Sequence, residues 1–455
     1  MSFLEQLAIN AANFIWGTPL LILLMGGGLF FMIYSRFLPY KYFTHAIAIL
    51  RGKYHDDADP GEISQFQALS GALAATVGMG NISGVAVAIA TGGPGAVFWM
   101  MVSAAIGMST KFFTCTLAVM YRGKDSDGNI QGGPMYVITE GLGQNWKPLA
   151  IFFCVAGFFG ATPIFQANQL IQVIHEAVLY PTAMASADSQ TSNILVGVII
   201  TAIVGFVIFG GIKRIANVAS RLVPSMVLLY GACVLFIMAK YYDNVIPSFM
   251  LILEDAFTAN AALGGAVGAI IMTGVRRAAF SNEAGIGTSP MMHGAAQTKE
   301  PVREGLVAMM EPFIDTMVVC TLTGMSIIVT GAWKDPDANG ITLTSKAFEL
   351  AMPGIGPLLL MICVTIFAIT TIFGLAYYSK KCFSFMFGTG FDTPFNLYYM
   401  GLVVLGSVLS LQAVFSFIDF AYALMAIPTV ISAVLLAPKV KQAAKEYFDR
   451  MKVTE

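Results

Sequence analysis

Charge is scarce in this chain. Asp, Glu, Lys and Arg together make up 11% of its 455 residues and leave a formal net charge of −1. A typical soluble domain carries about 25% charged residues, so the composition excludes that class. The bulk charge gives no information about partners, and we expect no nucleic acid among them. The four histidines form no cluster and have no metal-ligand spacing.

Catalytic and nucleotide-binding signatures are also missing. The sequence contains no GxSxG, no HExxH and no Walker A motif, so transport driven directly by ATP is not indicated. The six cysteines fall in or beside apolar segments without a CxxC pair, which predicts neither disulfides nor a metal site. We therefore expect a protein that is not an enzyme and has no cofactor. The first residues, MSFLEQLAIN, lack the basic region of a signal peptide, so we expect the apolar run after them to be retained.

Apolar residues are abundant. They make up 57% of the chain, and the mean hydropathy is +0.74. Because a spanning helix needs about 20 apolar residues, the sequence predicts an all-α membrane protein in a lipid bilayer, with about eleven spans. They are expected at Phe14–Tyr34, Ser64–Ala90, Gly95–Tyr121, Leu149–Leu179, Ile194–Gly210, Leu222–Lys240, Leu263–Met291, Gly305–Thr330, Ile355–Tyr378, Phe395–Leu409 and Ala413–Leu436.

The positive charges predict an orientation. Three of the 25 Lys and Arg residues lie within spans, namely Lys111, Arg276 and Arg277. Most of the others fall in alternate connections and in the C-terminal tail, and the opposite connections hold only Lys240, Lys334 and Lys346. Because cytoplasmic loops carry the excess of Lys and Arg, we expect a multi-pass protein of the plasma membrane with its N-terminus outside and its C-terminus in the cytoplasm.

The second and seventh spans are the two irregular ones. They lie five helices apart and therefore cross the membrane in opposite directions. This predicts a five-plus-five inverted repeat, spans 2–6 against 7–11, with two discontinuous helices and one extra N-terminal helix. We expect the extra helix and a cytoplasmic loop in residues 1–60, the repeats in 61–240 and 241–438, and a basic cytoplasmic tail in 439–455. Interrupted segments at corresponding positions of two repeats indicate the binding site of a secondary transporter.

The irregular part of the second span reads Thr76-Val77-Gly78-Met79-Gly80-Asn81. Two glycines so close together weaken a helix by about 1 kcal/mol each relative to alanine. Lipid cannot satisfy the backbone groups that a break exposes, so a break must be buried or face a water-filled cavity. The alternative is that the glycines only allow a neighbouring helix to pack closely.

The irregular part of the seventh span is predicted at Ile271, Met272, Thr273 and Gly274, followed by Arg276, Arg277 and Glu283. An ionisable residue in the bilayer costs several kcal/mol unless it is paired or hydrated. Arg276 and Arg277 are therefore candidates for an intracellular gate, with Glu283 as a possible partner. Alternatively, the helix surfaces early and both arginines are cytoplasmic. Other charged residues predicted within spans are interpreted as gate or packing pairs without assigned partners: Lys111, Glu311, Asp315 and Asp419.

Other polar side chains in the spans have two interpretations each. Gln166 and Gln169 share a helix face and could bind a substrate or form hydrogen bonds between helices. Thr370 and Thr371 could bond back to their own helix, or provide the oxygen ligands that a hard cation prefers.

Several segments resemble the alanine or glycine:cation symporter family, and together they extend over residues 60–440. Gly92 to Met108 (GGPGAVFWMMVSAAIGM) is similar to the family signature, and other matches are GMGNISG (78–84), DGNIQGGPMYVI (127–138), TPIFQAN (162–168) and GVRRAAFSNEAGIGTSP (274–290). The resemblance implies a sodium- or proton-coupled importer of small amino acids. It also implies the five-plus-five fold of the sodium-coupled leucine transporter.

That more distant fold relative has a GLGN break, which GMGN (Gly78–Asn81) resembles. The match implies a sodium site at the carbonyls of Ala74, Val77 and Phe367 with the hydroxyls of Thr370 and Thr371. It also implies that Thr76 and Gly80 hold the substrate's amino and carboxylate groups and that Asn81 lies at a second sodium position. The substrate-binding candidates are therefore Thr76, Gly78, Gly80, Asn81, Phe165, Gln166, Gln169, Ile271, Met272, Thr273 and Gly274.

These observations favour a sodium-coupled symporter that imports alanine or glycine by alternating access. One alternative is a proton-coupled transporter of another small amino acid. A channel or a substrate sensor is a further alternative.

Overall fold

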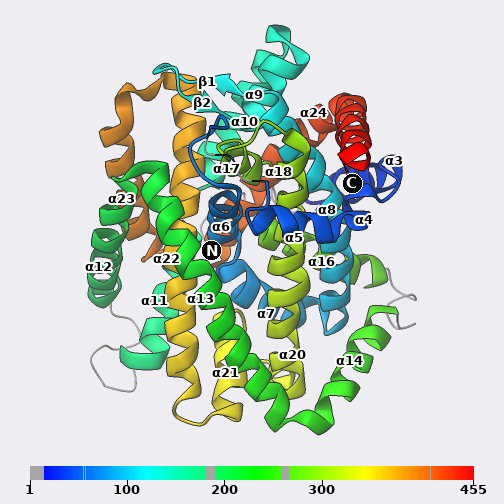
Figure 1. The fold of residues 1–455 in the computed structure, drawn as a ribbon. Helices are drawn as coiled ribbons and strands as arrows, with labels where there is room; N and C mark the ends of the chain where they lie inside the picture. Colours follow the sequence, from blue (N-terminus) through cyan, green and yellow to red (C-terminus); the bar gives the residue numbers. More distant parts are fainter. Residues whose placement is uncertain are drawn as a thin grey trace.

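The computed structural model describes residues 15–54, 56, 58–179, 190–257, 266–409 and 411–454. Nearly all of these residues lie in helices, and the long helices run side by side through the body of the molecule (Figure 1). Besides helices and the loops between them, the described residues form a two-stranded antiparallel hairpin near one end, made of β1 (Gly123–Lys124) and β2 (Ile130–Gln131). This confirms the all-α prediction.

The elements up to residue 240 include helices at each of the predicted spans 1 to 6 and short helices in the predicted connections, such as Phe43–Leu50 and Pro134–Tyr136. They are α2 (Thr18–Leu21), η1 (Ile22–Gly26), α3 (Gly27–Tyr34), α4 (Leu38–Lys41), α5 (Phe43–Leu50), α6 (Gln65–Thr76), α7 (Met79–Gly92), α8 (Gly95–Met120), α9 (Pro134–Tyr136), η2 (Val137–Leu142), η3 (Gln144–Trp146), α10 (Lys147–Gly160), α11 (Ile164–Ile174), η4 (His175–Leu179), α12 (Gln190–Ile208) and α13 (Gly211–Lys240).

The second part of the chain contains two helices in the predicted connections, α14 and α21. Its elements are α14 (Tyr242–Phe257), α16 (Ala266–Asn282), α17 (Ser289–His293), α18 (Pro301–Ala308), α19 (Met310–Pro312), η5 (Phe313–Cys320), α20 (Thr321–Val329), η6 (Ala332–Lys334), α21 (Ile341–Ala351), α22 (Gly356–Phe387), η7 (Thr389–Phe391), α23 (Asp392–Gly406) and α24 (Leu411–Thr454).

By length and composition, 7 described helices could cross a membrane, or up to 8 if the bent pair α6–α7 counts as one span. The predicted number of eleven spans is therefore not confirmed. The segment Thr18–Tyr34 is apolar but short, α23 has only 15 residues, and α16 carries two arginines. The division into repeats at 61–240 and 241–438 stays a prediction.

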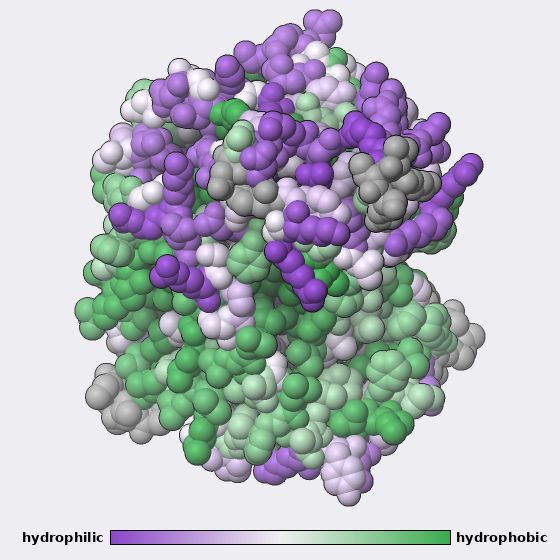
Figure 2. All heavy atoms as spheres, viewed as in Figure 1, coloured by the Kyte–Doolittle hydropathy of each residue, from purple (hydrophilic) through white to green (hydrophobic). Residues whose placement is uncertain are grey.

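Polar and apolar surfaces separate along the molecule. Hydrophilic side chains gather at the end that holds the hairpin, α9 and the end of α24, and apolar side chains cover the middle (Figures 1 and 2). On α12 and α13, large side chains such as Leu195, Phe206 and Leu228 are 63%, 76% and 73% exposed. Such an apolar surface fits contact with lipid. The hydrophilic end is the one that the charge pattern predicts to be cytoplasmic.

The helix pair α6–α7 lies at the centre, and α6 packs against α13 and α22 while α7 packs against α16 and α21. Ser64 caps α6: its hydroxyl accepts a hydrogen bond from the Gln67 N–H, and the Gln67 side chain accepts one from the Ser64 N–H. The two helices are bent by 42° at Val77 and Gly78. The structure thus confirms the break that the sequence predicts in the second span.

We predict that the connection at Asp337 and the tail at Lys445 lie on opposite sides of the membrane. Both residues are exposed, and all six native cysteines are buried, so Asp337→Cys and Lys445→Cys each introduce one reactive thiol. An impermeant thiol reagent applied to intact cells should label Asp337→Cys at once and Lys445→Cys only after permeabilisation. Labelling of both in intact cells would remove the basis for the predicted orientation.

Candidate functional site

The break between α6 and α7 is held by two side-chain amides. Asn81 Oδ1 accepts a hydrogen bond from the Gly78 N–H (2.9 Å), and Gln166 Oε1 accepts one from the Met79 N–H (3.2 Å). In a continuous helix these N–H groups would donate to the carbonyls four residues earlier, beginning with Ala74. The break therefore leaves carbonyl oxygens at the end of α6 without their helical donors.

Helix α22 brings two threonines to this break, and their hydroxyls differ. Thr370 Oγ1 donates back to the carbonyls of Ile366 (2.9 Å) and Phe367 (3.0 Å). Thr371 Oγ1 is buried and has no hydrogen-bond partner within the described ranges. A Cβ on Gly78 would clash with this hydroxyl, so Thr371 lies directly against the break. The structure thus brings the α6 and α22 sodium candidates together, with Thr371 as the unpaired oxygen.

The predicted substrate residues on α11 take different roles. Gln166 holds the break, as described above. Gln169 Oε1 accepts a hydrogen bond from Ser83 Oγ (2.6 Å), which is the interhelical bond of the alternative interpretation. The ring of Phe165 packs edge-on against Phe280 with centroids 5.1 Å apart, and Phe280 in turn lies against Gly80. Phe165 and Phe280 thus form an apolar wall beside the break.

Thr76, which the resemblance places at the substrate, lies at the C-terminal end of α6. Its hydroxyl donates to the Ala72 carbonyl in the preceding turn (3.2 Å). The Thr76 side chain is therefore satisfied within its own helix, and what Thr76 can offer to a ligand is its backbone.

The second break is not where the sequence analysis expected it. The residues from Ile271 to Gly274 lie in the continuous helix α16. Thr273 packs beside Gly92, which lies at the end of α7 opposite to Gly80. Gly274 packs against Trp99 of α8. A single threonine-glycine pair did not interrupt the helix. The prediction that these four residues, Ile271, Met272, Thr273 and Gly274, form a broken segment is therefore wrong, and their role in substrate binding stays a prediction.

The break follows α16 instead, at the residues between Asn282 and Ser289. Glu283, Gly285 and Gly287 have positive φ angles of 54°, 86° and 102°, which a helix cannot accommodate. The Glu283 carboxylate accepts hydrogen bonds from the hydroxyls of Tyr422 (2.6 Å) and Thr288. Glu283 thus stabilises the break.

Arg276 and Arg277 both bind Asp419 of α24. Their Nη2 atoms lie 2.6 and 2.7 Å from the same carboxylate oxygen, Oδ2. Arg277 also lies over the rings of Phe280 and Phe415, 5.5 and 5.0 Å from their centroids. The arginines, the carboxylate and the rings form a closure that we call the Arg–Asp gate.

One prediction about this gate needs correction. The partner of the arginines is Asp419 and not Glu283, because Glu283 lies beyond the end of α16 and its carboxylate is engaged elsewhere. The arginines precede the break, and their partner Asp419 is predicted in the outer half of its span. The side of the membrane on which this gate lies stays a prediction.

Asp315 on η5 connects the two broken helices, and the sequence analysis did not assign it a partner. Its carboxylate accepts hydrogen bonds from Asn81 Nδ2 (2.6 Å), Ser281 Oγ (2.5 Å) and Thr316 Oγ1 (2.7 Å). Asn81 follows the first break and Ser281 precedes the second. The signal in the sequence was a carboxylate within a predicted span, which Asp315 shares with Glu311.

A second set of buried charges lies beyond the second break. Lys111 Nζ is 2.8 Å from Glu311 Oε1, and both also contact the hydroxyl of Ser289 on α17. His293 Nδ1 lies 2.6 Å from Glu304 Oε1. We call these five residues the inner network. They attach α17 to α8, α18 and α19.

Comparison with known proteins gives consistent results. The family model described as the sodium:alanine symporter family matches residues 1–455. The sodium/alanine symporter AgcS of Methanococcus maripaludis is 37% identical over 96% of both chains. An uncharacterized transporter of Haemophilus influenzae is 40% identical over 99% of this chain and 97% of its own. The probable sodium/glutamine symporter GlnT of Bacillus subtilis is 32% identical over 98% of this chain and 91% of its own.

A solved structure shows the same fold. The crystal structure of MhsT in complex with L-phenylalanine aligns with a TM-score of 0.62, covering 83% of this chain and 89% of MhsT. MhsT has the leucine-transporter-type fold, so the architecture agrees with the expected one. The sequence identity is 13%, and the likeness concerns the fold alone.

We predict that Asp419→Asn destabilises the protein and opens the Arg–Asp gate. Removing one partner of a buried ion pair leaves an uncompensated charge, at a cost of about 3 kcal/mol. The melting temperature should fall, and Thr76→Cys, which lies on the central helix pair, should react faster with a thiol reagent applied from outside.

The matched control is Glu300→Gln. It removes the carboxylate of the exposed pair between Glu300 and Arg450, and such a pair contributes about 1 kcal/mol or less. Equal melting temperatures and equal labelling rates for the two variants would contradict the gate.

Proposed function

The chain belongs to the sodium:alanine symporter family, whose members are multi-pass membrane transporters and not enzymes, and we propose that it imports alanine or glycine together with sodium across the plasma membrane. The observation that carries this proposal is the unpaired hydroxyl of Thr371 beside the break between α6 and α7. Coupling to protons, or transport of another small amino acid, is the first alternative. A channel or a sensor is the second.

Sodium fits the atoms at the break. It is a hard cation that prefers oxygen ligands. The carbonyls of Ala74 and Val77 lie at the broken end of α6, and Thr371 Oγ1 has no other partner. The Phe367 carbonyl and the Thr370 hydroxyl, already bonded to each other, complete the set on α22. We propose that these five residues hold the coupling ion.

The substrate would bind at the same break, on the side where α7 begins. Helix α7 begins at Met79, and the N–H groups of its first turn carry a partial positive charge that favours a carboxylate. Gly80 presents its backbone there, and Phe280 and Phe165 close the space around it. These rings leave little room for a side chain, which supports selection of alanine and glycine over larger amino acids.

Alternating access requires the two sides to open in turn. We propose that the Arg–Asp gate closes the outer path and that the inner network closes the inner path. Ser289 of the inner network follows the second break, and Arg277 of the gate precedes it. A conformational change at the second break would therefore reach the Arg–Asp gate through α16 and the inner network through α17.

Uptake into proteoliposomes tests this function. An inward sodium gradient should drive accumulation of labelled alanine above its external concentration. Unlabelled glycine should compete, because one missing methyl group is worth only about 1–3 kcal/mol in an apolar pocket. Leucine should compete much less, because it must displace the rings of Phe165 and Phe280.

Each alternative has its own outcome in the same vesicles. Accumulation driven by a pH jump without sodium would indicate proton coupling. A channel or a sensor would give no uphill accumulation, and leucine competing as well as alanine would contradict the proposed walls.

We predict that Thr371→Val raises the sodium concentration for half-maximal alanine uptake by about tenfold. The change removes one ion ligand, and a hydrogen bond to a charged group is worth about 1.5–3 kcal/mol. The alanine concentration for half-maximal uptake at saturating sodium should change little, because the substrate backbone is intact.

Thr370→Val is the matched control, since its hydroxyl already bonds to Ile366 and Phe367 in its own helix. Its effect on sodium dependence should be smaller than that of Thr371→Val. Identical sodium curves for the wild type and Thr371→Val at normal expression would rule out the proposed ion site.

A further inference from the structure

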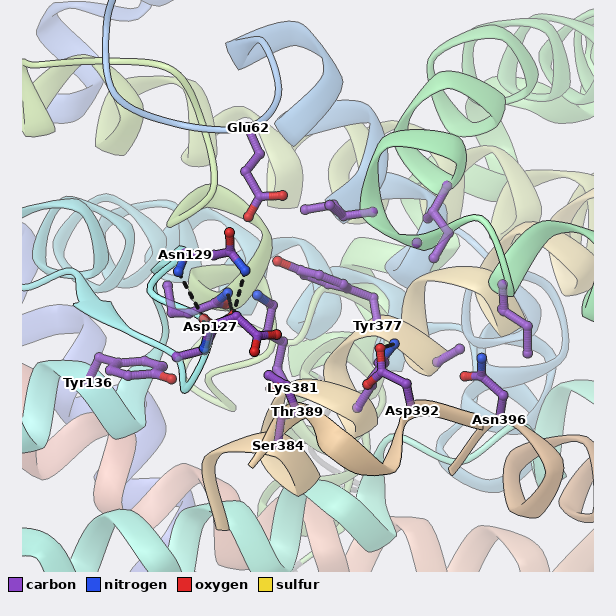
Figure 3. A pocket seen from close by; sticks show the side chains of 18 residues that line it. Glu62, Asp127, Asn129, Tyr136, Tyr377, Lys381, Ser384, Thr389, Asp392 and Asn396 are labelled. Carbon is purple, nitrogen blue, oxygen red and sulfur yellow. Dashed lines mark hydrogen bonds and ion pairs between the residues drawn. The ribbon is translucent and has the colours of Figure 1, made fainter. Parts of the chain in front are cut away.

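A polar cavity of about 230 Å³ lies toward the hydrophilic end, and its lining includes none of the residues of the two breaks (Figure 3). Its walls come from the hairpin loop, from the turn between α12 and α13, from the last part of α22 and from the start of α23. Tyr377 on its wall is six residues beyond Thr371 on α22, which corresponds to about 9 Å along the helix. The cavity thus begins close to the proposed ion site, on its predicted cytoplasmic side.

Two lysines line the cavity, and their environments differ. Lys380 Nζ forms an ion pair with Asp392 Oδ2 at 2.7 Å. Lys381 has no ion-pair partner within 4.0 Å in the part of the chain that the structure describes, and its Nζ lies 5.0 Å from the centroid of the Tyr377 ring. Lys381 is therefore a cation on the cavity wall whose charge is not matched by a contacting carboxylate.

The hairpin supplies a hydrogen-bond acceptor without a donor. Gln131 is only 4% exposed, and its Nε2 donates to Asp125 Oδ2 (2.7 Å). Gln131 lines the cavity, and its Oε1 has no hydrogen-bond partner among the described residues. A buried unsatisfied polar atom costs about 1–3 kcal/mol, so a donor at this position would stabilise the protein.

Carboxylates complete the lining. Glu62 points into the space from the side opposite to Lys381 (Figure 3). Burial alone would raise the pKa of Asp125, but hydrogen bonds from Asn129, Asp127 and Gln131 outweigh it and hold that pKa below its usual value. Asp125 is therefore ionised at neutral pH. The cavity presents an unmatched cation on one side and negative or acceptor groups on the other.

We propose that this cavity is a second binding site for a zwitterionic amino acid, at which Lys381 binds the carboxylate and Gln131 and Glu62 bind the ammonium group. A simple anion would be repelled by the carboxylates, and a simple cation would be repelled by Lys381. Only a ligand with both charges matches the lining. The proposal rests on the proposed function, because it makes the cavity the site that an imported amino acid occupies on its way to the cytoplasm.

Occupancy of this site by internal amino acid should hinder release and so inhibit uptake. The experiment uses right-side-out membrane vesicles that contain the full chain and are loaded with graded concentrations of alanine. The initial rate of sodium-driven uptake of labelled alanine is measured at each internal concentration. For the wild type, we expect saturable inhibition by internal alanine.

Lys381→Met removes the cation that is proposed to bind the carboxylate of alanine. The internal alanine concentration for half-inhibition should therefore rise by about tenfold, which is the effect of losing one charged hydrogen bond. Gln131→Leu should raise it in the same direction by a smaller factor. The external alanine concentration for half-maximal uptake should stay unchanged in both variants. Because the two substitutions lie on different elements, Gln131→Leu still tests the site if Lys381→Met fails to fold.

Lys124→Met is the matched control, since Lys124 is an exposed lysine of β1 that does not line this cavity. It should behave as the wild type. Inhibition curves of Lys381→Met and Gln131→Leu that coincide with the wild type, or a wild type that internal alanine does not inhibit, would overturn the second site. A wild type without sodium-driven uptake would instead contradict the proposed function.

Discussion

The constraint on which this structure depends is the cost of an unpaired peptide group away from water. A helix that crosses a membrane can be interrupted only if other groups replace the lost backbone hydrogen bonds. At Gly78 and Met79 the replacements are the side-chain oxygens of Asn81 and Gln166. These two amides satisfy the donors of the break and leave its acceptors, the carbonyls at the end of α6, available. A cation is a suitable partner for acceptors that remain, and this is why we propose the break as the ion site.

The same residues explain how one break can influence the other. The amide of Asn81 accepts a hydrogen bond from the first break with its oxygen and donates one to Asp315 with its nitrogen. Asp315 in turn accepts from Ser281, which lies just before the second break. A buried carboxylate needs such donors, and a displacement of either helix would disturb them. The broken helices are therefore connected by a chain of short, buried hydrogen bonds.

Local sequence was sufficient for some features and not for others. The α6–α7 break was predictable because Gly78 and Gly80 stand close together in an apolar span. The second break was placed too early: Gly274 stays helical, while the later glycines and Glu283 adopt positive φ angles. The pairing of Arg277 with Asp419 joins residues 142 positions apart, and a single sequence carries no signal of that contact. The alternatives for Gln169 and Thr371 depended on neighbours from other helices, which only the fold supplies.

Burial distinguishes the two closures energetically. In the Arg–Asp gate the Arg276 side chain is 20% exposed, so water can hydrate it when the gate opens. In the inner network Lys111 and Glu311 are 1% and 0% exposed, and separating them would remove the ion-pair partner of each buried charge. In the proposed transport cycle, opening the inner side would therefore require the separation of a fully buried ion pair. A ligand shifts a conformational equilibrium only by its difference in affinity for the two states. Since Ser289 contacts Glu311 and follows the second break, we infer that ion and substrate binding at the breaks supplies the free energy that releases the inner network.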